Sequence, residues 1–236
     1  MRGVGTLVNI ATVALGTLAG VVLGARIPER IRAAALQVVG LVTIVIGIDE
    51  ALVTRNVVFP LVALILGAVL GELLRIEERL EGLGERVRHK VEGDEEEGRP
   101  ATRFVDGFVA ASVLFCVGPL TVLGSIRDGL GGPDHAQLLL VKSALDGLVA
   151  VVFASTLGWG VGFSVLTIAV VQGTLTLGAG AADSLLTARM VTEMTAAGGV
   201  MILGIGLRLL DVKQVPVASL LPALLLAPVL VALFAR

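Results

Sequence analysis

Long apolar stretches, separated by short groups of charged residues, glycine and proline, dominate the hydrophobic pattern of the chain. A helix needs roughly 20 mostly apolar residues to cross a bilayer, and these stretches lack the period-2 alternation of a barrel strand. The pattern predicts eight transmembrane helices, at Val4–Ala25, Ala33–Thr54, Val57–Leu74, Phe104–Ser125, Ala136–Thr156, Val161–Leu177, Leu185–Leu207 and Val215–Phe234. Only residues 157–160 separate the fifth from the sixth, so a broken or re-entrant helix there would reduce the crossings to seven.

Composition also indicates an all-α polytopic transmembrane bundle. Hydrophobic residues make up 56% of the chain and charged residues 16%, and the mean hydropathy is +0.95, whereas about 25% of the residues in soluble domains are charged. Of the 18 Lys and Arg and the 20 Asp and Glu residues, 17 fall between Glu72 and Arg103. We therefore expect a first transmembrane part with three spans at residues 1–75, a charged segment at 76–103, and a second transmembrane part with four or five spans at 104–236.

Lysine and arginine are distributed unevenly between the two sides that eight spans define: one side holds 12 of them and the other holds five. Because cytoplasmic loops are enriched in Lys and Arg, the count predicts that segment 76–103 is cytoplasmic and that both termini lie outside. Apolar residues recur at three- and four-residue spacing from Leu73 to Val91, which predicts an amphipathic interfacial helix. Residues 92–100 form an acidic linker that is too polar to pack.

A weak internal similarity relates the first three spans to the last three. Gly40 and Gly47 match Gly199 and Gly206 at an offset of 159 residues. Three-helix repeats that begin five crossings apart have opposite topology, and such inverted repeats are typical of secondary transporters with a site near the bilayer midplane. Chance similarity between glycine-rich apolar helices is the alternative interpretation.

Glycines spaced four residues apart predict close helix packing. They are Gly16, Gly20 and Gly24 in the first span and Gly67 and Gly71 in the third. Such faces let helix backbones approach each other where lipid removes the hydrophobic drive for association. The expected partners are therefore the lipid bilayer and, as an alternative use of the glycine faces, a second copy of the chain in a homodimer.

The clearest polar group at membrane depth is the pair Lys142 and Asp146 in the fifth span. Their i, i+4 spacing puts both on one helix face, and Asp146 lies about ten residues into its span, roughly 15 Å deep. Ionisable residues inside a membrane are costly and mark functional sites by default, so the pair predicts an ion or proton pathway. A structural ion pair packed against another helix is the alternative.

A helix break is predicted in the fourth span at Gly118, because Pro119 removes a backbone donor and obstructs the preceding turn. Backbone groups freed at such a break can bind an ion, and Thr121 and Ser125 follow on one face; an ordinary kink without a ligand is the alternative. The predicted pathway residues are Asn9, Gly118, Pro119, Thr121, Ser125, Lys142, Asp146, Gln172 and Glu193.

Other functions lack residues to carry them. The formal net charge of −2 gives no reason to expect nucleic-acid binding, and the single cysteine, Cys116, cannot form an internal disulfide. The chain has no Gly-rich phosphate loop, no His/Cys metal spacing and no Ser–His constellation. We therefore expect no enzyme, no cofactor and no metal site. With one Trp and no Tyr there is little to stack a flat ligand, so a small polar solute or an ion fits better.

Several polar motifs stand out beside the glycine face of the first span: Gly5–Asn9, Gly118–Thr121, Gly124–Gly129, Lys142–Asp146 and Phe153–Gly158. In these motifs the chain resembles the bacterial membrane-protein family of domain of unknown function 554, the YdfK/YqgA type. The resemblance covers essentially the whole chain. It implies a polytopic protein of the bacterial inner (plasma) membrane and specifies no substrate.

The leading functional hypothesis is a secondary transporter of an ion or small polar solute. Asp146, Glu193 and Lys142 are its candidate protonation or coupling groups, and the break at Gly118 is part of the site. An ion channel is the alternative within transport. The alternative of a different class is a non-transporting scaffold or sensor that binds a partner through the cytoplasmic helix at residues 73–91.

Overall fold

The computed structural model describes residues 2–26, 28–79, 82, 101–116, 119–131 and 135–234. In these ranges the chain is an all-α bundle, which confirms the predicted fold class. The helices are α1 (Val4–Ala25), α2 (Glu29–Ala51), α3 (Val58–Leu73), α5 (Ala101–Cys116), α6 (Pro119–Leu130), α7 (Gln137–Leu157), α8 (Gly160–Leu177), α9 (Ala179–Leu185), α10 (Ala188–Leu209), the 3-10 helix η1 (Val217–Leu220) and α11 (Ala223–Phe234).

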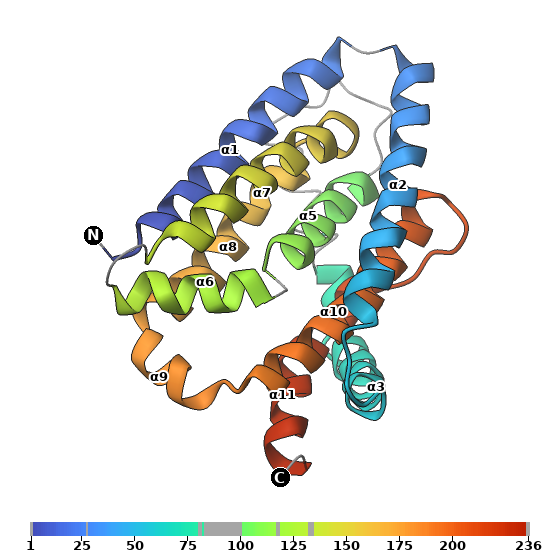
Figure 1. Cartoon of the computed structure of the whole chain (residues 1–236). Helices are drawn as coiled ribbons and strands as arrows, with labels where there is room; N and C mark the ends of the chain where they lie inside the picture. The colour runs from blue at the N-terminus through green and yellow to red at the C-terminus, as the bar shows by residue number, and fades with distance from the viewer. Residues whose placement is uncertain are drawn as a thin grey trace.

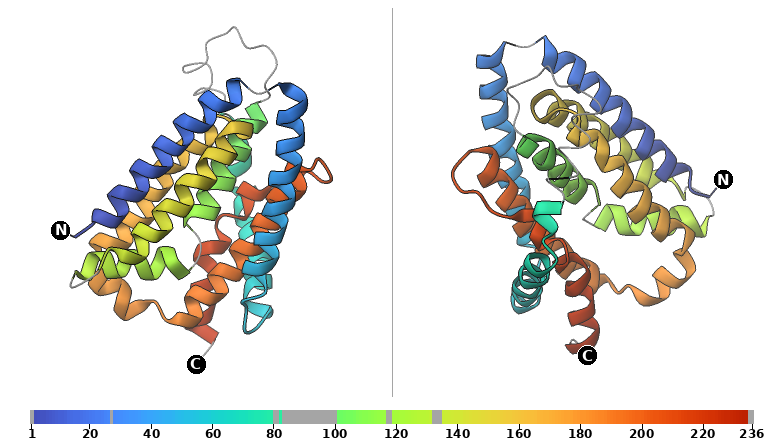
Figure 2. Two further views of the ribbon diagram at one scale, coloured as in Figure 1. Left: turned by 45° about the horizontal axis from the view of Figure 1, so that its top comes forward. Right: turned by 180° about the vertical axis from the view of Figure 1, so that it is seen from behind.

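One group of helices consists of α1, α7 and α8, which run side by side, with α5 packed on α8 (Figures 1 and 2). The glycines of α1 give the direction of its neighbour: Gly16 faces Gly147 and Gly24 faces Ser155, so α1 and α7 are parallel. The predicted glycine face of the first span is therefore occupied by α7 of the same chain.

The direction of α8 is opposite to that of α1. Gly3, at the start of α1, lies beside Thr176 near the end of α8, whereas Thr17 lies beside Gly162 near the start of α8. This antiparallel packing aligns the first two turns of α1 with the last two turns of α8.

The second group pairs α2 with α10 and α3 with η1 and α11, and α5 also contacts α10 (Figure 1). Gly40 faces Leu210 and Gly47 faces Leu203, so α2 and α10 are antiparallel. On α3, a Cβ atom at Gly71 would collide with the Ser219 carbonyl oxygen. The glycine face of α3 is therefore also used inside the chain.

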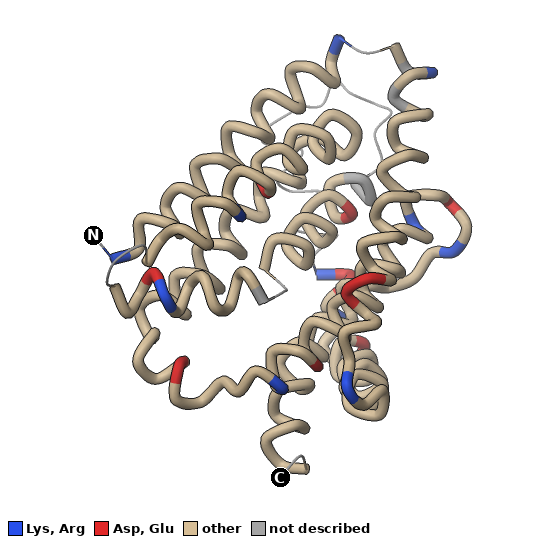
Figure 3. The backbone as a smooth tube through the Cα atoms, in the orientation of Figure 1, with Lys and Arg blue, Asp and Glu red and all other residues tan. Residues whose placement is uncertain are grey.

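The outward faces of the helices are apolar, as expected for contact with lipid. On α1, Leu15 is 65% exposed while its neighbour Gly16 is buried, and on α8 Val170 is 67% exposed. Charged residues are sparse along the long helices and lie mostly near their ends (Figure 3). Large exposed leucine and valine side chains would be unfavourable in water but are stable against acyl chains.

Most predicted spans correspond to observed helices. In the described ranges six helices are long and apolar enough to cross a membrane, and a seventh if the bent pair formed by α5 and α6 counts as one span. α3 lies where the third span is predicted, but it has only 16 residues, fewer than the roughly 20 that a perpendicular crossing needs.

The fourth predicted span is two helices. α5 ends at Cys116 and α6 begins at Pro119, and the axes of Phe104–Cys116 and Leu120–Leu130 differ by 60°. The sequence predicts a break here, and Gly118 itself lies outside the described residues. The predicted amphipathic helix at 73–91 and the acidic linker also lie largely outside them.

The short helix α9 was not predicted. It precedes α10, which begins only at Ala188 because the hydroxyl of Thr187 accepts a hydrogen bond from the Met190 amide (3.3 Å) and caps the helix. The predicted start at Leu185 was therefore three residues early.

Candidate functional site

The packing of α1 against α7 brings buried polar groups of the two helices together. A Cβ atom on Gly20 would collide with the Val151 carbonyl oxygen, and one on Gly24 with the Ser155 carbonyl oxygen. Only glycine permits backbones to approach this closely. As a result, the side chain of Asn9 on α1 reaches the polar face of α7.

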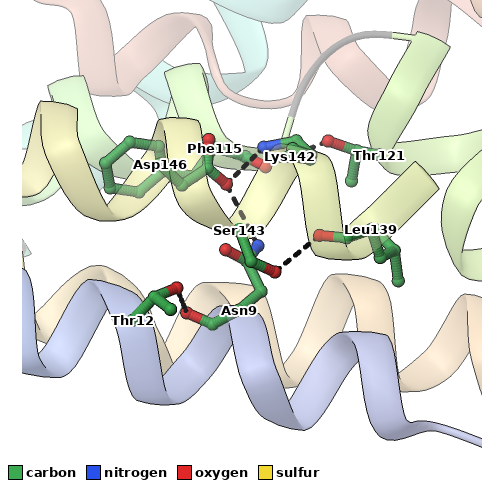
Figure 4. Close-up of polar contacts among 8 residues, drawn as sticks. All are labelled: Asn9, Thr12, Phe115, Thr121, Leu139, Lys142, Ser143 and Asp146. Carbon is green, nitrogen blue, oxygen red and sulfur yellow. Dashed lines mark hydrogen bonds and ion pairs between the residues drawn. The ribbon is translucent and has the colours of Figure 1, made fainter. Parts of the chain in front are cut away.

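Asp146 is the centre of this polar group (Figure 4). Its Oδ2 atom accepts hydrogen bonds from the Lys142 ammonium group on the same helix and from the Asn9 amide on α1, the latter at 3.0 Å. Asp146 is 7% exposed, Lys142 is 6% exposed and Asn9 is fully buried. An ion pair taken out of water loses hydration, and the additional amide donor compensates part of that loss.

The break between α5 and α6 lies beside the same pair. The Lys142 ammonium nitrogen is 5.9 Å from the centre of the Phe115 ring, within cation–π range. The Phe115 carbonyl cannot receive a helical hydrogen bond from Pro119, which has no N–H. Thr121 replaces that donor, since its hydroxyl donates to the Phe115 carbonyl at 3.0 Å (Figure 4).

A second polar group lies at the start of α1, between α6 and α8. The amide of Thr6 donates to Oδ2 of Asp128 at 3.2 Å, which caps a helix whose own N-cap residue, Gly3, supplies no side chain. The Thr6 and Thr176 hydroxyl oxygens are 3.0 Å apart, and Thr176 donates to the Ser125 carbonyl at 3.2 Å. Asp128 is fully buried.

Gln172 lies one helical turn before Thr176 on α8. Its side chain is fully buried, and among the described residues neither its amide nitrogen nor its amide oxygen has a hydrogen-bond partner. A buried primary amide without partners is rare in folded proteins and is usually satisfied by water or a ligand. Gln172 is therefore the least satisfied of the predicted pathway residues.

Glu193 is placed in a different part of the molecule. Its carboxylate accepts hydrogen bonds from the Thr54 hydroxyl at 2.5 Å and from the Arg55 amide at 3.0 Å. Both donors belong to the connection between α2 and α3. Glu193 thus holds this connection against α10, and the structure does not bring it together with Asp146.

A buried charge network outside the predicted set joins the end of α10 to the starts of neighbouring segments. The Arg208 guanidinium forms ion pairs with Glu77 and with Asp106, the latter at 2.9 Å, and donates to the Val215 carbonyl at 3.1 Å. Glu77 also accepts from the Ala218 amide at 2.8 Å and so caps η1. The network ties the segment after α3, the start of α5, the end of α10 and η1 together.

The sequence contains a signal for one buried polar residue that was not among the predicted pathway residues, Asp128. Thr121, Ser125 and Asp128 are spaced i, i+4 and i+7, which places Asp128 on the polar face of α6. No comparable pattern marks Glu77 or Asp106, because the three members of the Arg208 network are far apart in sequence. Within the described ranges no three His, Cys, Asp or Glu side chains come together as a metal site.

Known proteins resemble the chain over nearly its whole length. Residues 4–232 match the model of a family described as protein of unknown function (DUF554). The chain is 33% identical to the uncharacterized protein YqgA of Escherichia coli (strain K12), over 95% of this chain and 94% of that protein. It is 28% identical to the uncharacterized membrane protein YdfK of Bacillus subtilis (strain 168), over 96% and 95%. No solved structure matches the chain.

Proposed function

The chain belongs to the DUF554 family, and we propose that it is a secondary transporter that carries an ion or a small polar solute across the bacterial inner membrane. The observation that carries the proposal is the Lys142–Asp146 pair, which is buried within a long membrane helix and shares its carboxylate with Asn9. Ionisable groups at such a depth are costly, and in membrane proteins they mark substrate or ion pathways.

Because Asp146 is paired with Lys142, a cation or a proton can replace Lys142 as the partner of its carboxylate. A cation or proton that reaches Asp146 competes with the Lys142 ammonium group, because both interact with the same carboxylate. When the carboxylate is neutralised, the buried ammonium group loses its counter-charge, and an unpaired buried charge is strongly unfavourable. The surrounding helices then favour an arrangement that hydrates or re-pairs Lys142, so occupancy is coupled to conformation.

A two-fold relation between the halves of the chain supports the proposal. With the offset of 159 residues, Gly40 corresponds to Gly199 and Gly47 to Gly206. A Cβ atom on Gly206 would lie 3.1 Å from the Gly40 carbonyl oxygen, and one on Gly47 would lie 2.9 Å from the Gly199 carbonyl oxygen. Exchanging the halves turns one of these contacts into the other, as an inverted repeat requires.

The other helix pairs are also consistent with an exchange of the two halves of the chain. α1 lies parallel to α7, and α8 lies parallel to α5, since Gly160 faces Phe104 and Thr167 bonds to Ser112. We propose that α1, α2 and α3 form one three-helix repeat and that α8, α10 and the η1–α11 segment form the other, related by a two-fold axis in the membrane plane. Superposition of the two segments without inversion, in an experimental structure, would remove this support.

The proposed orientation places segment 76–103 in the cytoplasm. A cysteine at Gly93, in a Cys116→Ala background, is then labelled by an impermeant maleimide only from the cytoplasmic side. A cysteine at Lys213 serves as a reference for the same side and one at Gln137 for the opposite side, because both positions are exposed at opposite ends of the bundle. Labelling of Gly93→Cys from outside intact cells contradicts the orientation.

Transport is tested in proteoliposomes by recording transient currents on solid-supported membranes after jumps in H⁺, Na⁺ or K⁺ concentration. We expect a current with the parent chain and none with the double variant Asp146→Asn, Lys142→Met, which removes both charges and leaves no unpaired ion. The double variant is first shown to be monodisperse and folded.

A folded double variant with parental currents would assign the pair a structural role. A parent chain without currents for any of these ions contradicts ion transport. That result favours the alternative of a scaffold that binds a partner through residues 73–91. A channel would instead give large currents that continue for as long as the ion gradient lasts.

A further inference from the structure

Buried polar side chains continue from the Asp146 pair toward the end of the bundle that holds the connection between α6 and α7. We call them the polar row: Thr6 and Asn9 on α1, Ser125 and Asp128 on α6, and Gln172 and Thr176 on α8. Each member is at most 8% exposed. Because Asn9 also donates to Asp146, the row leads directly to the proposed site.

The order of the row follows from the antiparallel packing of α1 and α8. Thr6 and Thr176 face each other, with 3.0 Å between their hydroxyl oxygens. One turn along α1 from Thr6 corresponds to one turn back along α8 from Thr176. Asn9 and Gln172 therefore lie at the same level, between the Thr6–Thr176 contact and Asp146.

Unpartnered polar atoms occur along the whole row. The Asn9 Oδ1, Ser125 Oγ and Asp128 Oδ1 atoms and both amide atoms of Gln172 are buried and have no hydrogen-bond partner within the described chain. Buried polar atoms in native proteins that lack protein partners are satisfied by ordered water. A series of such atoms on three facing helices indicates a series of waters.

The helices around the row approach too closely for a larger solute. A Cβ atom on Gly5 would lie 2.6 Å from the Leu139 Cβ, and one on Gly124 would lie 2.9 Å from a Leu139 methyl carbon. A Cβ atom on Gly129 would collide with the Thr176 carbonyl oxygen. Backbones this close leave no room for a solute larger than water.

We propose that the polar row is a single-file water path that delivers protons from the α6–α7 end of the bundle to Asp146. Each water or hydroxyl oxygen accepts one proton and releases another, so Asp146 gains a proton and every oxygen of the row keeps its number of protons. The O–H bonds then point the opposite way and reorient before the next transfer. The inference deepens the proposed function, because it rests on transport at Asp146 and names the proton as the ion.

Charged and titratable groups surround both ends of the row. At the α6–α7 end, His135 Nε2 is 3.9 Å from Asp128 Oδ1, and Arg2 lies near Gly131. At the inner end Lys142 pairs with Asp146, and Cys116 of α5 and Glu50 of α2 are close enough to Lys142 to interact electrostatically. Asp128 is the only carboxylate among the row's own members.

Water in the row is tested by cysteine reactivity toward Ag⁺, a thiol-reactive cation small enough for a narrow path. Single cysteines at Ser125 and Gln172 are introduced into the Cys116→Ala chain in sealed vesicles. Thiols left after a timed Ag⁺ exposure are counted with a fluorescent maleimide in denaturant. Because Ag⁺ reacts with hydrated thiolates, both cysteines should react about tenfold faster than thiols in lipid.

The matched controls are Leu123→Cys and Val170→Cys. Each lies two residues from a test position on the same helix but is exposed to lipid, at 51% for Leu123 and 67% for Val170. Cysteines at Gln137 and Lys213 report the two aqueous sides. Ag⁺ should prevent maleimide labelling of the test cysteines only when it is added on the side from which it also reacts with Gln137→Cys.

Proton delivery is tested by the parent chain and Gln172→Leu in liposomes loaded with a pH-sensitive dye. Gln172→Leu should slow the proton flux about tenfold because it removes a water ligand, while Gln172→Asn should keep most of the flux.

Test cysteines no more reactive than the lipid-facing controls would overturn the water path even if transport is observed. A reactive row in a chain that carries Na⁺ or K⁺ but no protons overturns the assignment of the ion. A reactive row in a chain without any transport instead overturns the proposed function.

Discussion

The α1–α7 pair and the α2–α10 pair both pack through glycine, yet they bury charge in opposite ways. Between α1 and α7 the charged groups, Lys142 and Asp146, lie within the helix length and have unpartnered polar neighbours. In α10, Glu193 lies as far from the helix start as Lys142 does in α7, but it binds backbone and hydroxyl donors of the α2–α3 connection. Arg208, at the end of α10, binds two carboxylates.

The difference distinguishes two roles of a buried charged side chain, which is costly in free energy: holding segments together and taking part in transport. A buried charge whose partners come from several segments fixes the position of those segments, since moving any of them exposes an unpaired ion. A buried pair beside polar atoms that lack protein partners can bind water or an ion there and exchange partners. We therefore expect substitutions in the α10 charges to affect folding, and substitutions near Asp146 to affect transport once charge is balanced.

The largest effect is expected for Arg208→Met. It leaves Glu77 and Asp106 without their shared counter-charge, and breaking a buried pair costs about 5 kcal/mol at the upper end of measured cases. The free energy of unfolding can be measured by SDS titration, with Trp159, the single tryptophan, as fluorescent reporter. Adding Glu77→Gln and Asp106→Asn should recover most of the stability. A single variant as stable as the parent would show that the network does not hold these segments.

A smaller loss, about 3 kcal/mol, is expected for Asp146→Asn, which leaves the Lys142 ammonium group unpaired beside the proposed water path. Adding Lys142→Met should restore the stability measured by SDS titration, but transport currents should stay absent. Restoration of both stability and currents would place this pair in the same class as Arg208 and remove the contrast between the two regions.

The sequence predicts the helices and the Lys142–Asp146 pair because both depend on local information. Apolar length defines a span, and i, i+4 spacing puts two side chains on one face. It does not predict the Arg208 network or the position of Glu193, because these depend on which helix ends meet in three dimensions. Glu193 is deep in its predicted span, but nothing in its neighbourhood along the chain indicates that Thr54 and Arg55 fold over it.

The α1–α7 interface is tested by Gly20→Ala. The added methyl group would collide with the Val151 carbonyl oxygen, and overpacking of this kind costs about 2 kcal/mol. Because α1 then moves away from α7, the contact between Asn9 and Asp146 should weaken and transport should slow. Gly173→Ala on α8 is the control, since a Cβ atom there meets nothing within 4 Å. Equal effects of the two variants would mean that close approach is not what positions Asn9.

The smallest effect is expected for Thr54→Val, which removes the hydroxyl that donates to Glu193 at 2.5 Å and accepts from the Asn56 amide at 3.1 Å. Loss of a hydrogen bond to a charged group costs about 1.5 kcal/mol. Thr54→Ser keeps the hydroxyl and should retain parental stability in the same SDS titration. Because the Glu193 contact fixes a connection far from Asp146, currents corrected for folded protein should be unchanged in both variants. If Thr54→Val lowers transport without lowering stability, Glu193 takes part in the transport step, and the boundary between the two regions lies elsewhere.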